Sequence, residues 1–178
     1  RTELGSQSAG GMTIMAAREG DVTPGGEATF DIGVTGGAGK PAAVRVWVGT
    51  EDGKGSITTE SGALSAYPYG FAARFEGKKG TNPEELLGAA HAGCFTMALG
   101  AKLSAAGFPP EKLSTRANLT LEQVQGNWTI TTIHLELTGK VPGVERAKFD
   151  ELANDAKATC IVSRALTAQI TLTATLEA

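Results

Sequence analysis

Alternating apolar and polar positions mark a group of strands in the first half of the chain. Residues 44–48 alternate valine with larger polar or aromatic residues, and residues 56–60 continue the pattern after a glycine-containing turn at 51–55. Residues 71–75 alternate again, which would place Arg74 on the face opposite two phenylalanines. The pattern therefore predicts three antiparallel strands.

A long segment of small and apolar residues follows these strands. Its start is marked by Thr81 or Asn82 as a capping residue, by Pro83 in the first turn and by two glutamates at the positive end of the helix dipole. The helix should run to about Ala106. Glycine and alanine leave its surface small nearly all round, so we expect a buried helix with other backbones packed closely against it.

Two further strands are predicted beyond the long helix. Residues 117–121 place three apolar side chains on one face, and residues 128–137 form a second strand after a turn. Within this second strand the apolar positions change parity near residues 131–132. The change indicates either a β-bulge or a strand that is buried on both faces.

The last elements are a helix and a strand. Residues 144–159 have the apolar spacing of an amphipathic helix that ends at Cys160, and residues 168–176 alternate as a final strand. The order is strands, long helix, strands, helix and strand. This order predicts an α+β fold, with two antiparallel sheets around the long buried helix.

Composition changes after the first quarter of the chain. Residues 1–42 hold ten of the 24 glycines and one aromatic residue, Phe30, a composition typical of flexible or weakly packed chain. Residues 28–34 have a strand pattern, and a loop at 36–41 can join them to the next strand as a hairpin. We expect a glycine-rich extension over 1–42 that can contain one strand and holds no catalytic residues, and a main domain over 43–178.

Charge and composition limit the classes of protein to be considered. The 178 residues carry a formal net charge of −3, and lysine and arginine are scattered, so the chain lacks the basic surface of a nucleic-acid-binding protein. The longest uncharged run, residues 86–101, would span about 24 Å as a helix, short of the roughly 30 Å of a bilayer core. The first residues show no apolar signal region. These features favour a cytoplasmic protein without a membrane segment.

The chain has two cysteines, Cys94 within the apolar helix and Cys160 at the end of the amphipathic one. Two are too few for a secreted disulfide scaffold, and in a reducing compartment a close pair is more often catalytic than structural. A thiol is a nucleophile only when its thiolate is stabilised. The question is therefore which charged residues reach Cys94, and whether Cys160 reaches it too.

Several short motifs surround these cysteines. In chain order they are Gly53-Lys54-Gly55 with Thr59-Glu60-Ser61-Gly62, Tyr69-Gly70-Phe71 with Arg74-Phe75-Glu76-Gly77, and Gly80-Thr81-Asn82-Pro83-Glu84-Glu85-Leu86 with Ala89-Ala90-His91-Ala92-Gly93-Cys94-Phe95. With these motifs, residues 43–178 resemble the osmotically inducible protein C (OsmC) branch of the organic hydroperoxide resistance superfamily.

The resemblance implies an intertwined homodimer and a thiol peroxidase that reduces organic hydroperoxides to alcohols, in oxidative and osmotic stress defence. Carried over to this chain, it makes Cys94 the peroxidatic thiol and Cys160 the resolving thiol, with Arg74 and Glu84 completing the site. The implied reductant is a lipoyl-type or other small dithiol, and no cofactor is implied. The family usually has proline directly after the second cysteine, where this chain has Ile161.

Elementary chemistry agrees with these roles. A free thiol, with a pKa of about 8.5, is only slightly ionised near neutral pH, so fast attack on a peroxide requires a nearby cation, for which Arg74 is the best candidate. Glu84 would orient the guanidinium, because an arginine–carboxylate pair has a fixed geometry. The sulfenic acid formed at Cys94 would then be captured by Cys160 as a disulfide. Because Glu84 and Cys94 lie about 15 Å apart along one predicted helix, we expect each site to combine two subunits.

The substrate pocket should be apolar. Phe71, Phe95 and Met97, with the aliphatic face of the long helix, offer surroundings that favour an alkyl tail over hydrogen peroxide.

Alternative interpretations stay open for the same residues. Cys94, Cys160, His91 and a carboxylate could bind a metal, although the chain has no CxxC or HxxxH spacing. The groove beside Cys94 could instead belong to a non-enzymatic binder of small apolar ligands. His91, one turn before Cys94, could modulate the thiol, but a satisfied core or interface histidine is the simpler interpretation, and we leave it outside the catalytic set.

Overall fold

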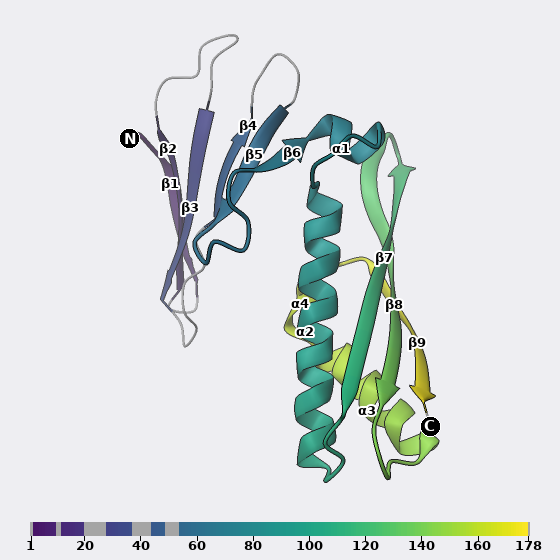
Figure 1. Ribbon diagram of the computed structural model, residues 1–178. Coiled ribbons are helices and arrows are strands. Elements are labelled where there is room, and N and C mark those ends of the chain that lie inside the picture. The colour runs from purple at the N-terminus through teal and green to yellow at the C-terminus, as the bar shows by residue number, and fades with distance from the viewer. Residues whose placement is uncertain (1, 10–11, 20–27, 37–43, 49–53, 178) are drawn as a thin grey trace. The chain divides into compact units, whose positions relative to one another are not determined.

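The computed structural model describes residues 2–9, 12–19, 28–36, 44–48 and 54–177 (Figure 1). The chain forms two compact units, Arg1–Asn82 and Pro83–Ala178. Most of the predicted loop at 36–41 and of the predicted turn at 51–55 lies outside the described residues.

The first unit contains a six-stranded antiparallel sheet with the strand order β1-β2-β3-β4-β5-β6. Its strands are β1 (Thr2–Ala9), β2 (Met12–Glu19), β3 (Ala28–Gly36), β4 (Val44–Val48), β5 (Lys54–Thr59) and β6 (Tyr67–Gly70). The strands predicted at residues 44–48 and 56–60 are confirmed as β4 and β5. Pro68 lies in β6, at the edge of this sheet, where a residue without an N–H group is tolerated.

The N-terminal part of this sheet holds more strands than predicted. The strand expected at residues 28–34 is β3, and it pairs with β4 in the expected antiparallel manner, with Ala28 opposite Val48. Two further strands that the sequence pattern did not indicate, β1 and β2, extend the same sheet. Their sequences show no sustained alternation. Backbone pairing, of β1 with β2 and of β2 with β3, therefore defines these strands more than side-chain pattern does.

Residues 71–75 form a short helix, α1 (Phe71–Phe75), and the strand predicted there was wrong. Five residues are too few to separate a period of 2 from a period of 3.6, because positions four apart share a face in either structure. The rings of Phe71 and Phe75 lie 4.8 Å apart between centroids. The two alanines and the arginine between them are good helix formers, and the neighbouring strand is instead β6.

The second unit contains the long helix, a three-stranded sheet and two shorter helices (Figure 1). Its elements are α2 (Pro83–Ala105), β7 (Lys112–Val124), β8 (Asn127–Lys140), α3 (Arg146–Thr159), α4 (Ile161–Ala165) and β9 (Gln169–Glu177). The helices predicted at about 83–106 and 144–159 are confirmed as α2 and α3, whereas α4 was not anticipated. α2 packs along β7 and against α3 and α4.

α2 is buried along one stripe, in contrast to the prediction of a helix buried nearly all round. The stripe consists of Gly88, His91, Phe95, Leu99 and Leu103, at the three- and four-residue spacing of one helix face. On another face of α2, the side chain of Met97 is 77% exposed. Within this unit, the sheet and the shorter helices cover only part of the circumference of α2.

The same helix is long and apolar enough to cross a membrane by length and composition alone. The uncharged run, residues 86–101, would span about 24 Å, whereas all 23 residues of α2 would span about 34 Å. In this unit, however, its buried stripe faces protein and contributes three of the large side chains of the core. Such a composition is also that of a core helix.

The sheet of the second unit has the order β7-β8-β9. The predicted β-bulge is present, since Thr120 pairs with Thr132 and Leu121 pairs with Ile130, which leaves Thr131 as the extra residue. β9 runs parallel to β8, so this sheet is mixed, and the prediction of an antiparallel sheet was wrong for its last strand. Parallel neighbours need a crossover connection, which α3 and α4 supply between β8 and β9.

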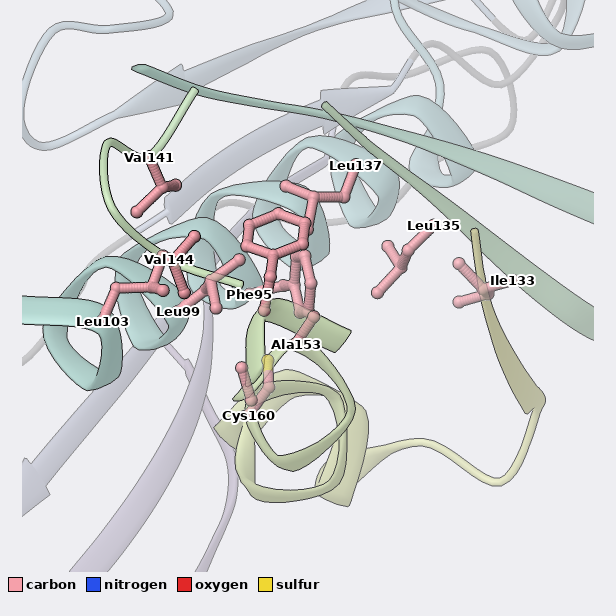
Figure 2. Packing of buried hydrophobic residues seen from close by; sticks show 12 residues of the cluster. Phe95, Leu99, Leu103, Ile133, Leu135, Leu137, Val141, Val144, Ala153 and Cys160 are labelled. Atoms are coloured by element: carbon pink, nitrogen blue, oxygen red, sulfur yellow. The ribbon is translucent and has the colours of Figure 1, made fainter. Parts of the chain in front are cut away.

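The core of this unit lies where α2, β8 and α3 meet (Figure 2). It is formed by Phe95, Leu99, Leu103, Ile133, Leu135, Leu137, Val141, Val144, Phe149, Ala153, Ala156 and Cys160. Burial of a side chain as large as leucine or phenylalanine contributes about 1.5–3 kcal/mol. The cluster therefore fixes α2 relative to α3, and Cys160 belongs to it.

Gly139 of β8 should not tolerate a side chain. A Cβ atom there would lie 2.8 Å from Cζ of the buried Phe149 and 3.1 Å from Cδ2 of Leu113. We expect Gly139→Ala to lower the free energy of unfolding by about 1–3 kcal/mol, because the Phe149 ring cannot move without disturbing the core. Urea unfolding measures this change.

Gly100→Ala in α2 is the matched control. Its Cβ would make an ordinary contact of 3.8 Å with Leu113, and alanine should stabilise a helix interior by roughly 0.5–1 kcal/mol. Equal unfolding free energies for the two variants would contradict the packing described for Gly139.

Candidate functional site

The two cysteines, far apart in sequence, lie together in the second unit. Cys94 is carried by α2 next to the buried Phe95, and Cys160 continues the buried stripe of α3 that includes Ala153 and Ala156. The two Sγ atoms are 2.9 Å apart, and both residues are free thiols. The packing of α2 on α3 therefore brings together the two thiols that the sequence singled out.

Cys160 occupies the junction between two helices. It ends α3 and precedes α4, with an extended ψ of 129° that interrupts the helical path. The first N–H groups of a helix have no partner within that helix. Here the backbone N–H groups of Val162 and Ser163 and the hydroxyl group of Ser163 lie near the Cys160 sulfur and act to lower the pKa of its thiol.

These contacts set the ionisation of Cys160. Burial alone would raise the pKa of this thiol, because a thiolate loses solvation inside the protein. The hydrogen bond between the two thiols, together with the polar groups of Ser163 and Val162, outweighs burial, and the pKa of Cys160 falls below its ordinary value. The surroundings of the buried Cys160 thus favour its thiolate.

His91 lies on the buried stripe of α2, three residues before Cys94. It is fully buried, and its Nε2 is 2.7 Å from Oγ of Ser163. Its Nδ1 contacts no polar partner among the described residues. Burial lowers the pKa of His91, so its ring is neutral near neutral pH.

Sequence reasoning missed Ser163 and placed His91 among core histidines. The burial of His91 is confirmed, and its partner is a residue from the turn that carries Cys160. A signal for Ser163 was present in the sequence. Ser163 follows Cys160 by three residues, and residues at this spacing at the start of a helix can form side-chain to backbone hydrogen bonds with each other.

A hollow of about 680 Å³ opens beside the thiols. Its lining consists of Ala89, Ala90, Gly93, Cys94, Met97, Ala98, Thr159, Cys160 and Ile161, none of which carries a charge. Met97 lies in this lining as predicted, whereas Phe95 is directed into the core instead (Figure 2). Since Cys94 is partly exposed and Cys160 is only 1% exposed, a ligand in the hollow meets Cys94 first.

The two charged candidates are not part of this lining. Glu84 lines a separate hollow of about 510 Å³ between the start of α2 and β7. It precedes Cys94 by ten residues on the same helix, which corresponds to about 15 Å along the axis. Arg74 belongs to the first unit, where it is exposed on α1 with its guanidinium 5.6 Å from the centre of the Phe75 ring.

No cluster of three or more histidine, cysteine, aspartate or glutamate side chains with the spacing of a metal site occurs among the residues that the structure describes.

Comparison with known proteins places these residues in a family. The family model for OsmC-like proteins matches residues 76–175, a range that includes Glu84, Cys94 and Cys160 and begins after Arg74. The chain belongs to the OsmC-like protein family. It is 52% identical over 120 residues to Peroxiredoxin OsmC of Escherichia coli (strain K12), which covers 67% of this chain and 84% of that protein.

A second relative and two solved structures are also similar to this chain. The Organic hydroperoxide resistance protein of Xanthomonas axonopodis pv. citri (strain 306) is 33% identical over 101 residues, 56% of this chain and 69% of that protein. The organic hydroperoxide resistance protein OhrB of Bacillus subtilis is 26% identical with a TM-score of 0.57, covering 76% of this chain and 97% of that one. An OsmC protein from Legionella pneumophila shares the fold, with a TM-score of 0.61 at 17% identity over 80% of this chain and all of that one.

The distance between the thiols predicts an intramolecular disulfide. Treatment of the reduced protein with diamide should remove both free thiols of each chain, counted with Ellman's reagent, while the chain still migrates as a monomer on a non-reducing denaturing gel. Cys160→Ser is the control, since its remaining thiol has no partner in the same chain. Oxidised wild-type protein that migrates mainly as covalent dimers would contradict the geometry described for Cys94 and Cys160.

Proposed function

We propose that this OsmC-like protein is a cysteine-based peroxidase that reduces organic hydroperoxides to alcohols. The observation that supports this function best is the pair of free thiols 2.9 Å apart, one of them open to an apolar hollow. The hollow suits an alkyl or aryl substituent, and Cys94 lies where the O–O bond of such a ligand would meet sulfur. The names of its relatives, peroxiredoxin and organic hydroperoxide resistance protein, describe the same chemistry.

Cys94 acts as the peroxidatic thiol. Its thiolate attacks the distal oxygen of the hydroperoxide, an S–O bond forms, the O–O bond breaks, and the alkoxide leaves as the alcohol after taking up a proton. Cys94 is then a sulfenic acid. The accessible position of Cys94 in the hollow favours this role over the buried Cys160.

Cys160 acts as the resolving thiol. Its thiolate attacks the sulfur of the Cys94 sulfenic acid, the disulfide forms, and the hydroxide released becomes water. The short distance and the hydrogen bonds that favour the thiolate support this assignment. Ile161, which stands where the family usually has proline, begins α4 without preventing the turn at Cys160.

Arg74 and Glu84 of a second subunit complete each site in the homodimer that we propose. The lining of the Cys94 hollow carries no charge, so a cation that stabilises the Cys94 thiolate has to come from outside this lining. Glu84 of the same chain lies ten residues away on α2 and faces another hollow. In a symmetric dimer the missing groups can come from the partner, which gives two equivalent shared sites.

The remaining parts of the proposal concern reductant, location and domain limits. A dithiol of lipoyl type or another small dithiol reduces the Cys94–Cys160 disulfide, as expected for a chain that works in the cytoplasm. Residues 43–178 form the peroxidase domain, and residues 1–42 contribute no reacting group. Oxidative and osmotic stress defence is the corresponding biological role.

The two cysteine variants should behave differently. Cys94→Ser should abolish hydroperoxide reduction, because serine is not ionised at neutral pH. Cys160→Ser should still consume about one equivalent of cumene hydroperoxide per chain and then stall or over-oxidise, because the sulfenic acid has no resolving thiol. Steady-state assays with a dithiol, together with mass spectrometry of the product, measure both. Activity retained in Cys94→Ser would exclude the proposed nucleophile, and sustained turnover of Cys160→Ser would exclude the resolving role.

A second function, that of a non-enzymatic binder of apolar ligands, is favoured by the size and apolar lining of the same hollow. Such a protein would bind cumene or a fatty acid equally well with both cysteines replaced. It would show no turnover that depends on cysteine.

Mixed dimers test the shared site. Cys94→Ser and Arg74→Ala are each expected to be inactive, but a heterodimer of the two contains one site with an intact cysteine and the partner's intact arginine. Activity should therefore return to about one working site per heterodimer after subunit exchange. Verified heterodimers that stay as inactive as both parents would show that the site is built within one chain or that Arg74 is not the activating cation.

A further inference from the structure

A chain of polar groups runs from the buried His91 through the partly exposed Ser163 to the buried Cys160. The Nε2 atom of His91 is 2.7 Å from the Ser163 hydroxyl oxygen, and the Ser163 hydroxyl contacts the Cys160 sulfur. His91 and Cys160 are both buried to 99% or more, in the apolar surroundings of α2 and α3. The roles assigned so far to the two cysteines do not use His91.

The contacts of His91 determine where its proton lies. A neutral imidazole carries one N–H group, and the two ring nitrogens of His91 differ, because Nε2 has an oxygen partner while Nδ1 has none among the described residues. An unpaired buried N–H is rarer and more costly than an unpaired acceptor. We therefore assign the proton to Nε2, which donates to Oγ of Ser163.

This assignment orients the serine. When Oγ of Ser163 accepts from His91, its own proton is free to point at Cys160. The hydroxyl then donates to sulfur, which is the direction that stabilises a thiolate. A serine without this neighbour could rotate its proton away, toward the carbonyl oxygens available in any helical turn.

We propose that His91 is a positioning residue for the resolving step, because it fixes the Ser163 hydroxyl so that Cys160 is ready to close the disulfide. The proposal rests on the peroxidase function proposed above. In that step the Cys160 thiolate attacks the sulfur of the Cys94 sulfenic acid. The S–S bond forms, the S–O bond breaks, and the departing hydroxide takes up the proton that Cys160 had lost to solvent. Cys94 is reduced, Cys160 is oxidised, and one water is produced.

The first test isolates Cys160 from peroxidase activity. In a Cys94→Ser background Cys160 is the remaining thiol, and its titration is followed by thiolate absorbance near 240 nm. His91→Leu and Ser163→Ala should each raise the pKa of Cys160, because each removes the oriented hydroxyl proton. His91→Gln should restore most of the change, since its amide N–H can reach Ser163 from the same side. Adding His91→Leu to Ser163→Ala should have no further effect, because there is then no hydroxyl to orient.

The second test separates the two chemical steps. With both cysteines present, one equivalent of cumene hydroperoxide is mixed with reduced protein, and acid-quenched samples are analysed by mass spectrometry. His91→Leu should form the sulfenic acid at a rate within about twofold of wild type. Closure of the disulfide should slow on the order of tenfold near neutral pH, the effect of one hydrogen bond to a charged group. His91→Gln should again lie close to wild type.

The outcomes distinguish this proposal from the proposed function. A reduced protein that does not react with the hydroperoxide would overturn the peroxidase, while the titration in the Cys94→Ser background would still judge His91. A folded His91→Leu variant with an unchanged Cys160 titration would overturn the role of His91. Additive effects of His91→Leu and Ser163→Ala, or a slower first step with normal closure, would overturn it as well. Circular dichroism of each variant ensures that only folded proteins are compared.

Discussion

The packing of α2 against α3 is the contact on which the candidate site depends. The buried stripes of the two helices meet in one apolar cluster, and the two cysteines lie at its margin. Cys94 precedes Phe95, which is fixed in the core, so its own side chain is directed to the rim of the hollow. Cys160 follows Ala156 by one helical turn and stays within the core. A rotation of either helix by one residue would separate the sulfurs, so core packing sets the geometry of the chemistry.

The two thiols at this contact have different surroundings. Cys160 is enclosed, with polar groups from the start of α4 near its sulfur, while Cys94 faces an uncharged apolar hollow. Two neighbouring thiolates would repel each other, because like charges this close raise the free energy of the pair. The second unit therefore brings the two sulfurs together, but the lining of the hollow contains no cation that would activate Cys94. This asymmetry is the physical reason to look for Arg74 and Glu84 in a second subunit.

Much of this arrangement could be predicted from the sequence, since long periodic segments carry strong signals. The starts of α2 and α3, the bulge at Thr131 and the strand character of β3 to β5 all follow from spacing and capping residues. The short segment 71–75 fits helix and strand alike, and β1 and β2 depend on pairing that side-chain pattern does not encode. The direction of β9 depends on how α3 crosses the sheet. Ser163 and its contact with His91 bring together residues 72 positions apart, which only the folded chain reveals.

The separation of the cysteines in sequence has a thermodynamic consequence. Residues 94 and 160 are 66 positions apart, so a bond between them would close a large loop in the unfolded chain. In the chain-entropy treatment, closing a loop of this length raises the free energy of the unfolded state by about 4 kcal/mol, because the unfolded chain loses conformational entropy. An oxidised molecule would accordingly resist unfolding and proteolysis more than a reduced one. Each cycle of oxidation and reduction would then alternate between a more stable and a less stable chain. The lifetime of the protein in the cell would accordingly depend on the supply of its reductant.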